Sequence, residues 1–192
     1  MATFNYSTKW IVPVGGNDIR MKIEEAIQLI ANLRIESGGP QLWADLGCGS
    51  GLFSRALATV LPQQSKILCL DKASPGWKAS ETNHVALEFI KADFSKYEFE
   101  NGKFDGFMMA NSLHYIKNKA LLVNRLVSGL RPNGTILVIE YDTGSSNFWV
   151  PYPITYEKLK NLFLDNNINK VTKIGERPSR FGSIMYCCEV KP

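Results

Sequence analysis

The feature that most constrains the fold is a regular alternation between short apolar runs and segments of helical periodicity. The apolar runs, which predict strands, occupy residues 41–46, 66–70, 85–90, 104–110 and 135–141. The segments with apolar residues three or four positions apart, which predict helices, occupy residues 19–33, 50–61 and 113–130. Nearly continuous apolar strands that alternate with helices are typical of a parallel sheet covered on both faces. We therefore predict an α/β three-layer sandwich.

The pattern changes after residue 153. A helix is predicted over residues 155–164, followed by strand-like runs at 168–174 and 184–190 with no helix between them. Because this connection is too short for a crossover helix, the last two strands should pair antiparallel. The expected sheet has seven strands, is mostly parallel and includes a C-terminal antiparallel hairpin. The 192 residues fit a single domain, with an N-terminal arm (1–16), a ligand-binding core (17–141) and a C-terminal helix and hairpin (142–192).

Composition excludes several classes of protein. Hydrophobic residues make up 45% and charged residues 21% of the chain, ordinary values for a globular protein. A net charge of +4 is far below that of a dedicated nucleic-acid binder. No apolar run approaches the roughly 20 residues that span a bilayer, and the first ten residues hold no signal-peptide core. Four cysteines without a CxxC pair and two histidines predict no metal site. We expect a cytoplasmic protein.

A glycine-rich turn follows the first predicted strand, where open α/β sheets bind their ligands. Residues 45–51 read Asp-Leu-Gly-Cys-Gly-Ser-Gly, and the glycines allow the backbone to approach a ligand closely. The spacing is Gly-x-Gly-x-Gly rather than the Gly-x-Gly-x-x-Gly of dinucleotide enzymes. Asp45 would repel a pyrophosphate and attract an amino group. A nucleoside with a cationic amino-acid tail therefore fits better than a nicotinamide dinucleotide.

Polar residues also follow the next three strands. Asp71 lies 20 residues after Gly51, a spacing that suits a carboxylate bound to ribose hydroxyls. Asp93 stands beside Phe94, a pair able to bind an adenine amino group and stack on the base. The fourth strand is followed by residues 111–115, Asn-Ser-Leu-His-Tyr.

Together with Phe-Asp-Gly-Phe at 104–107 and Arg-Pro-Asn-Gly-Thr at 131–135, these motifs resemble the class I S-adenosylmethionine-dependent methyltransferases. The resemblance runs from about residue 41 to 141. It implies a Rossmann-like fold and S-adenosylmethionine as cofactor. By position it assigns the methionine part to Asp45 and the glycine loop, the ribose to Asp71, the adenine to Asp93 and Phe94, and the surroundings of the sulfonium to Asn111. The cofactor-binding candidates are Asp45, Gly47, Cys48, Gly49, Asp71, Lys72, Asp93, Phe94 and Asn111.

Methyl transfer from a sulfonium is an in-line displacement in which the cofactor already carries the activation. The protein mainly supplies alignment, and a base is needed only if the nucleophile must lose a proton. His114 is the best candidate for such a base, and Tyr115 is the second. The alternative is that both residues start a helix and only pack or cap it.

The sequence gives the least information about the methyl acceptor. The chain lacks the Asn-Pro-Pro-Tyr that often follows strand four in enzymes acting on base or amide nitrogens, and it shows no added recognition domain. These features favour a small-molecule acceptor over nucleic acid or a membrane, and they define no oligomeric state. Trp10, Tyr152 and Arg180 are the candidate substrate residues, with packing or a solvated turn as the alternative role for each. A methyltransferase acting on protein or RNA and a non-catalytic S-adenosylmethionine-binding module remain open.

Overall fold

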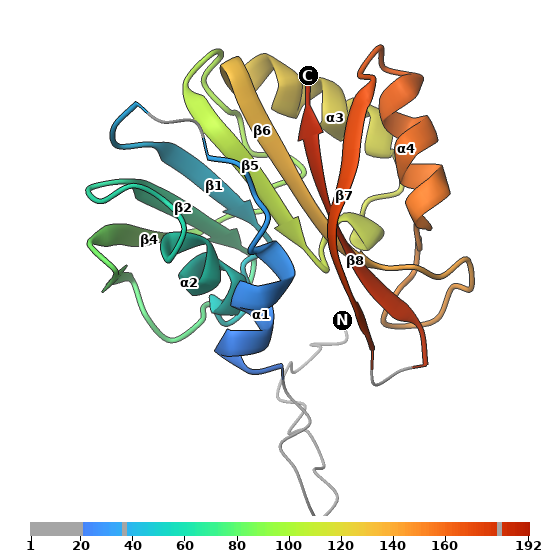
Figure 1. The fold of residues 1–192 in the computed structure, drawn as a ribbon, viewed down its shortest axis with the longest axis horizontal. Helices are drawn as coiled ribbons and strands as arrows, with labels where there is room; N and C mark the ends of the chain where they lie inside the picture. Colours follow the sequence, from blue (N-terminus) through green and yellow to red (C-terminus); the bar gives the residue numbers. More distant parts are fainter. Residues whose placement is uncertain (1–20, 36–37, 180–181) are drawn as a thin grey trace, which may run out of the picture.

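The computed structural model describes residues 21–35, 38–179 and 182–192 (Figure 1). A mixed sheet of eight strands runs through this part of the chain in the order β3-β4-β2-β1-β5-β6-β8-β7. The strands are β1 (Leu42–Leu46), β2 (Lys66–Asp71), β3 (Ala79–Thr82), β4 (Val85–Lys91), β5 (Phe104–Ala110), β6 (Leu130–Tyr141), β7 (Lys170–Pro178) and β8 (Ile184–Lys191). The helices are α1 (Ile23–Ile30), α2 (Leu52–Ala58), α3 (Lys119–Gly129) and α4 (Tyr156–Leu164), with a short 3-10 helix η1 (Leu113–Tyr115).

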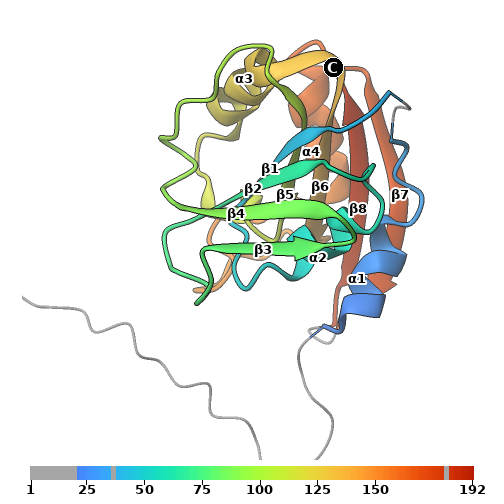
Figure 2. The same cartoon turned by 90° about the vertical axis from the view of Figure 1, so that its left-hand side faces the viewer.

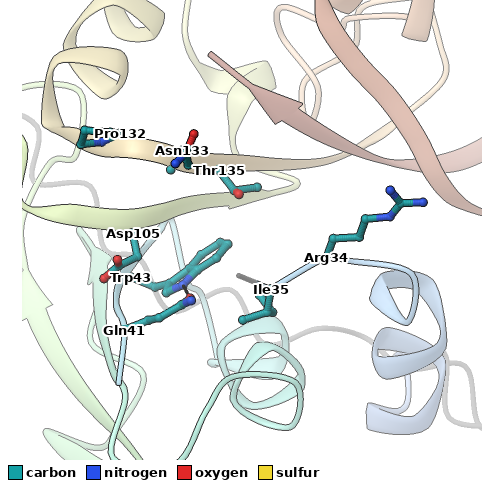
Figure 3. Close-up of a pocket in the computed structure, with 9 residues that line it drawn as sticks. Arg34, Ile35, Gln41, Trp43, Asp105, Pro132, Asn133 and Thr135 are labelled. Atoms are coloured by element: carbon teal, nitrogen blue, oxygen red, sulfur yellow. Dashed lines mark hydrogen bonds between the residues drawn. The ribbon is translucent and has the colours of Figure 1, made fainter. Parts of the chain in front are cut away.

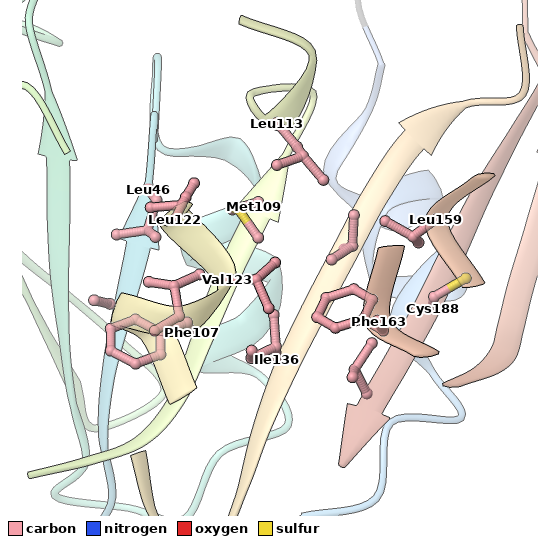
Figure 4. Packing of buried hydrophobic residues seen from close by; sticks show 14 of the residues in the cluster. Leu46, Phe107, Met109, Leu113, Leu122, Val123, Ile136, Leu159, Phe163 and Cys188 are labelled. Carbon is pink, nitrogen blue, oxygen red and sulfur yellow. The ribbon is translucent and has the colours of Figure 1, made fainter. Parts of the chain in front are cut away.

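The three predicted layers are confirmed. Helices α3 and α4 cover one face of the sheet, and α1 and α2 cover the other (Figures 1 and 2). On the first face, Leu122 and Val123 of α3 and Phe163 of α4 pack over Phe107 and Ile136 of the central strands (Figure 4). Successive strand residues point to opposite faces. The two adjacent cysteines of β8 accordingly belong to different clusters, Cys187 on the α1/α2 side and Cys188 on the α3/α4 side.

The sheet topology confirms the mostly parallel arrangement. Strands β4, β2, β1, β5 and β6 are mutually parallel neighbours. Strand β8 pairs antiparallel with both β6 and β7, which is the predicted C-terminal hairpin. No helix in the described ranges is long and apolar enough to cross a bilayer.

The prediction of seven strands is wrong by one. The additional strand, β3, pairs antiparallel with β4 through a two-residue turn at Asn83 and His84. Both turn residues have positive φ, 51° and 59°. Such turns usually contain Asn-Gly, whereas here His84 takes the place of the glycine, which adopts positive φ more readily. The strand is also short and polar, so the sequence carries no apolar signal for it.

The long helix predicted over residues 113–130 is two elements. Ile116 is extended, and Asn118 starts a new helix by accepting a hydrogen bond from the backbone N–H of Leu121. The interruption leaves the 3-10 helix η1 directly after β5, so that His114 stays at the end of the sheet.

Candidate active site

Two cavities lie at the carboxyl ends of the central strands and share a wall. The first, which we call the glycine-loop cavity, has a volume of about 490 Å³ and is lined mainly by residues 45–53, Asp71 and Ala110. The second, the aromatic cavity, has a volume of about 540 Å³ and is lined by η1, the end of β6 and residues of the loops at 143–150 and 182–183. Three residues line both cavities: Asn111, Tyr115 and Tyr141.

The glycine loop is held tightly against its neighbours. Gly47 has a φ of 81°, and a Cβ placed on it would lie 2.6 Å from the Cβ of Ser112. The backbone N–H groups of Gly47 and Cys48 both donate to the carbonyl of Leu70, at 2.8 and 3.1 Å. The N–H of Gly49 donates to the Asp71 carboxylate at 2.9 Å. The glycines therefore bring the backbone close to a ligand, while these three N–H groups are used inside the protein.

Asp45 is fully buried beneath this loop. Its Oδ2 accepts a hydrogen bond from the Ser54 hydroxyl at 2.5 Å, while its Oδ1 has no partner among the described residues. Burial raises the pKa of Asp45 to about 7, against the lowering effect of Ser54 and with a further increase from the nearby Asp71. A cation bound beside Oδ1 would supply the missing donor and favour the charged carboxylate.

Asn111 presents a second unpartnered acceptor at the shared wall. Its backbone has a φ of 54°, and its N–H donates to the carbonyl of Ile139 at 2.8 Å. Its side-chain Oδ1 is buried without a partner in the part of the chain that the structure describes. Asn111 and Asp45 thus both offer an acceptor to a ligand that donates hydrogen bonds.

His114 forms a buried pair with Glu140. The Nδ1 atom of His114 lies 2.7 Å from Oε2 of Glu140, and the backbone N–H of His114 donates to Oε1 at 3.1 Å. The two side chains are only 4% and 1% exposed. His114 nevertheless lines the aromatic cavity, beside Tyr115, whose ring centroid is 4.3 Å from that of the imidazole.

Known proteins with a similar sequence or fold are methyltransferases. Residues 44–134 match the family model of a methyltransferase domain. Over these 91 residues, slightly less than half of the 192, the chain is similar to methyltransferase domains. A stretch of 109 residues, 56% of the chain, is 28% identical to uncharacterised methyltransferases of Mycobacterium tuberculosis and Mycobacterium bovis. The match covers 54% of those proteins, so the chain spans about half the length of the curated relatives it matches.

Solved structures of methyltransferases share the fold of this chain. A Burkholderia thailandensis 1,6-didemethyltoxoflavin-N1-methyltransferase matches 88% of the chain and 77% of its own, with 20% identity and a TM-score of 0.62. A Thermotoga maritima S-adenosylmethionine-dependent methyltransferase, described as a possible histamine N-methyltransferase, matches 91% of both chains, with 15% identity and a TM-score of 0.63. At these identities the likeness establishes the fold.

The family's cofactor, S-adenosylmethionine, fits the glycine-loop cavity by charge. The described residues that line the cavity include two carboxylates, Asp45 and Asp71, and no lysine or arginine. A pyrophosphate would meet only negative charge there, whereas a cationic amino-acid tail would meet the unpartnered Oδ1 of Asp45. The residues present therefore suit S-adenosylmethionine and oppose a nicotinamide dinucleotide.

The structure brings five of the predicted cofactor residues to the cavity besides Asn111: Asp45, Gly47, Cys48, Gly49 and Asp71. The Asp71 carboxylate is fixed at the end of β2, because Oδ2 accepts from Gly49 and Oδ1 accepts from the backbone N–H of Ala73, both at 2.9 Å. Each oxygen keeps a second lone pair. Asp71 can therefore accept further hydrogen bonds from ribose hydroxyls.

Three predicted cofactor residues do not line either cavity. The Lys72 ammonium forms an ion pair with Asp93 at 3.0 Å, and Asp93 also accepts from the N–H and hydroxyl of Ser95. Phe94 is buried in the core on the α3/α4 side and packs beneath Gly47. The stacking of Phe94 on adenine stays a prediction. Assignment of Asp93 to adenine stays a prediction.

The structure describes only one of the three predicted substrate residues, Tyr152. Trp10 and Arg180 lie outside the described residues. The backbone N–H of Tyr152 donates to the carbonyl of His114 at 3.0 Å, but Tyr152 is not among the described residues that line the aromatic cavity. Its loop neighbours Trp149 and Val150 line that cavity instead.

Tyr115, the second candidate base, forms part of the shared wall. Burial raises the pKa of its phenol, and the nearby carboxylates of Glu140 and Asp71 raise it further. A phenol with a raised pKa stays protonated at neutral pH and is a poor base. Tyr115 is therefore better suited to contact a ligand than to accept its proton.

Sequence analysis missed Glu140 and Tyr141. Both stand in the apolar run at 135–141, which predicts a buried strand and directs attention away from its polar end. The available signal was the charge itself, because an acid inside an otherwise apolar strand must find a partner when it is buried. That partner is His114, 26 residues earlier in the chain.

A third, smaller hollow of about 130 Å³ lies at the opposite end of the sheet (Figure 3). It is lined by Gln41, Trp43 and Asp105, among others, and the indole N–H of Trp43 donates to the Gln41 side chain at 2.8 Å. The Asp105 carboxylate accepts from the backbone N–H of Leu42 at 2.7 Å and from the Arg131 guanidinium at 3.2 Å. These polar groups tie the starts of β1, β5 and β6 together.

Proposed function

We propose that the protein transfers the methyl group of S-adenosylmethionine to a small molecule bound in the aromatic cavity. The observation that carries the proposal is that the two cavities adjoin, since Asn111, Tyr115 and Tyr141 line both. A sulfonium methyl held in the glycine-loop cavity would lie next to an acceptor in the aromatic cavity where the two cavities meet. In-line displacement needs such an arrangement.

In this proposal the residues of the glycine loop and its neighbours bind the cofactor. Asp45 accepts hydrogen bonds from its amino group and balances that charge, and Asp71 accepts from the ribose hydroxyls. Asn111 offers its Oδ1 next to the transferred methyl group. When bound, the cofactor supplies an activated methyl carbon, so the protein's contribution is alignment and exclusion of water.

The aromatic cavity favours an uncharged acceptor with a flat apolar face. Tyr115, Tyr141, Trp149 and Val150 line it, and the described lining residues include no lysine, arginine, aspartate or glutamate. Hydroxyl and amide groups from residues 143, 147 and 183 add hydrogen-bonding capacity. The volume of about 540 Å³ lies in the range of small-molecule sites. The Burkholderia relative, solved with 1,6-didemethyltoxoflavin and S-adenosylhomocysteine bound, supports a small-molecule acceptor.

The test is transfer of radiolabel from S-adenosylmethionine with a labelled methyl group. Three substrate pools are offered separately: a panel of small phenols and nitrogen heterocycles, bulk RNA, and a mixed protein preparation. We expect label in the small-molecule pool, lost in an Asp45→Asn variant. Label in RNA or protein alone would replace the small-molecule acceptor with a macromolecule. Tight cofactor binding without transfer to any pool would favour a non-catalytic binding module.

A further inference from the structure

Glu140 is a carboxylate buried in the hydrophobic part of the protein. It lies on β6 opposite Tyr186 of β8, and its side chain is 1% exposed. Removing a charge from water is unfavourable unless hydrogen bonds replace the lost hydration. Both hydrogen bonds that the structure gives to Glu140 come from one residue, His114. The hydrogen bonds of the Glu140 carboxylate therefore hold His114 in place.

The contact determines which histidine nitrogen carries a proton. An ionised carboxylate only accepts hydrogen bonds, so Nδ1 of His114, 2.7 Å from Oε2, must be the donor. The neutral ring then has its lone pair on Nε2. No described residue bonds to Nε2, and His114 lines the aromatic cavity. An acceptor nitrogen to which no described residue bonds is thus carried by a residue that lines the proposed acceptor site.

Four other titratable groups surround this pair. Tyr115 of η1, Tyr141 of β6 and Tyr186 of β8 lie within electrostatic reach of Glu140, as does the Lys119 ammonium at the start of α3. Burial raises the pKa of each tyrosine. The phenols therefore stay neutral at neutral pH, and His114 is the residue in this group suited to accept a proton there.

Resting on the function proposed above, we propose that Glu140 is a positioning residue that holds His114 as the Nδ1–H tautomer, so that Nε2 removes a proton from the acceptor. The acceptor's lone pair forms a bond to the methyl carbon, the carbon–sulfur bond breaks with its electron pair going to sulfur, and the acceptor's proton moves to Nε2. Glu140 stabilises the resulting imidazolium. The acceptor atom consequently carries a hydrogen, as in a phenol, an N–H heterocycle or a thiol, and is not a tertiary amine or a thioether.

The first arm of the test is spectroscopic and needs no acceptor. The chain has two histidines, and the other, His84, is exposed in a turn. A His84→Asn variant leaves the His114 ring as the single imidazole in a long-range proton–nitrogen NMR spectrum of labelled protein. We expect the Nδ1–H tautomer when Glu140 is present and its loss in Glu140→Leu, with Glu140→Gln retaining it through the amide oxygen. The Nε2–H tautomer in the otherwise unchanged protein would overturn the proposal.

The second arm is kinetic. Glu140→Leu should lower kcat by about 100-fold to 10,000-fold, the usual contribution of general-base catalysis, and leave the affinity for S-adenosylmethionine unchanged in calorimetric titration. Glu140→Gln, which keeps the tautomer and loses the charge, should be intermediate. Unchanged kcat in that variant would overturn the positioning role.

The acceptor class is tested with matched pairs from the panel, each a phenol or N–H heterocycle against its O- or N-methylated counterpart, and with thioethers. We expect turnover of members that carry the hydrogen, and turnover of a thioether or tertiary amine at a similar rate would overturn the class. Failure of the protein to bind S-adenosylmethionine would instead overturn the proposed function, because the tautomer measurement stands without the cofactor.

Discussion

The two ends of the sheet treat their polar groups differently. At the amino end, Asp105 uses both carboxylate oxygens on Arg131, and one of them also accepts from the N–H of Leu42. At the carboxyl end, Oδ1 of Asp45 and Oδ1 of Asn111 are buried without a partner among the described residues. The hollow at the amino end is about 130 Å³, whereas the cavities at the carboxyl end are about 490 and 540 Å³.

This difference indicates that the polar groups at the amino end of the sheet stabilise the fold, whereas those at the carboxyl end are available to bind a ligand. A buried polar atom without a partner costs roughly 1–3 kcal/mol, so the carboxyl end sacrifices stability that the amino end secures. Ligands of open α/β sheets bind at the carboxyl ends of the strands. The unpartnered oxygens at that end are therefore best explained as acceptors of hydrogen bonds from a bound ligand.

The largest difference between the two ends of the sheet is expected when a methyl group is added to one glycine at each end. Gly47→Ala places a Cβ 2.6 Å from Ser112 in the loop at the carboxyl end. We expect the affinity for S-adenosylmethionine to fall on the order of 100-fold, because the loop must shift. Isothermal titration calorimetry measures the change.

The matched control is Gly102→Ala near the amino end, where φ is also positive and an added Cβ meets nothing within 4 Å. It should cost about 1 kcal/mol of stability from backbone strain and leave cofactor affinity unchanged. Equal losses of affinity in the two variants would mean that the glycine loop has no special role.

The second prediction exchanges one carboxylate for an amide at each end. Asp45→Asn should weaken S-adenosylmethionine binding by about 10-fold to 100-fold, because a hydrogen bond to a charged group contributes roughly 1.5–3 kcal/mol. Asp105→Asn should leave the affinity unchanged and lower the free energy of unfolding. Parallel titrations and denaturant melts distinguish the two effects, and an affinity loss in Asp105→Asn would contradict the separation of the two ends.

The third prediction concerns pH. Because burial raises the pKa of Asp45 to about 7, the free protein carries a proton there at pH 6 and a charge at pH 8. A cationic amino group binds the charged form, so affinity should fall about tenfold from pH 8 to pH 6, one factor of ten per unit below the pKa. Titration across this range measures it, and the dependence should vanish in Asp45→Asn.

The same raised pKa makes a prediction about stability, with the opposite sign. A carboxyl group whose pKa is higher in the folded protein than its usual 3.8 stabilises the fold below about pH 4. This contribution is lost as pH rises towards 7. The free energy of unfolding of the unliganded protein should therefore decrease over this range less steeply in Asp45→Asn than in the parent chain. Identical pH profiles for both proteins in denaturant melts would contradict the assigned pKa.

The smallest effect is expected from Arg131→Ala at the amino end. The Arg131 side chain is 49% exposed and pairs with Asp105 at 3.2 Å, and exposed ion pairs contribute about 0–1 kcal/mol. For a chain of this size that shifts the melting temperature by a few degrees at most. Cofactor affinity should not change in calorimetric titration, and a change would place Arg131 in contact with the site.

The sequence predicts the parts of this molecule that depend on local patterns. Apolar runs and helical spacing predict the three layers, and the glycine loop with Asp45 and Asp71 predicts the cofactor side of the site. What escapes prediction depends on contacts between distant segments. The aromatic cavity joins the end of β6 to loops at 143–150 and 182–183, and the pairing of Glu140 with His114 joins β6 to η1.

The error in the strand count has a local cause. Strand β3 lacks both an apolar face and the usual turn residues, so nothing in its pattern separates it from a loop. The close approach of the Phe94 ring to Gly47, in contrast, is a contact that only the folded chain reveals.

The most direct test of the central claim is calorimetric titration of the purified protein at pH 7.5 with S-adenosylmethionine, S-adenosylhomocysteine and NAD, alongside the Asp45→Asn variant. The account predicts one molecule of either of the first two ligands bound per chain, weaker binding of S-adenosylmethionine by the variant and no binding of NAD. Binding of NAD, or equal affinity of the parent chain and the variant for S-adenosylmethionine, would contradict it.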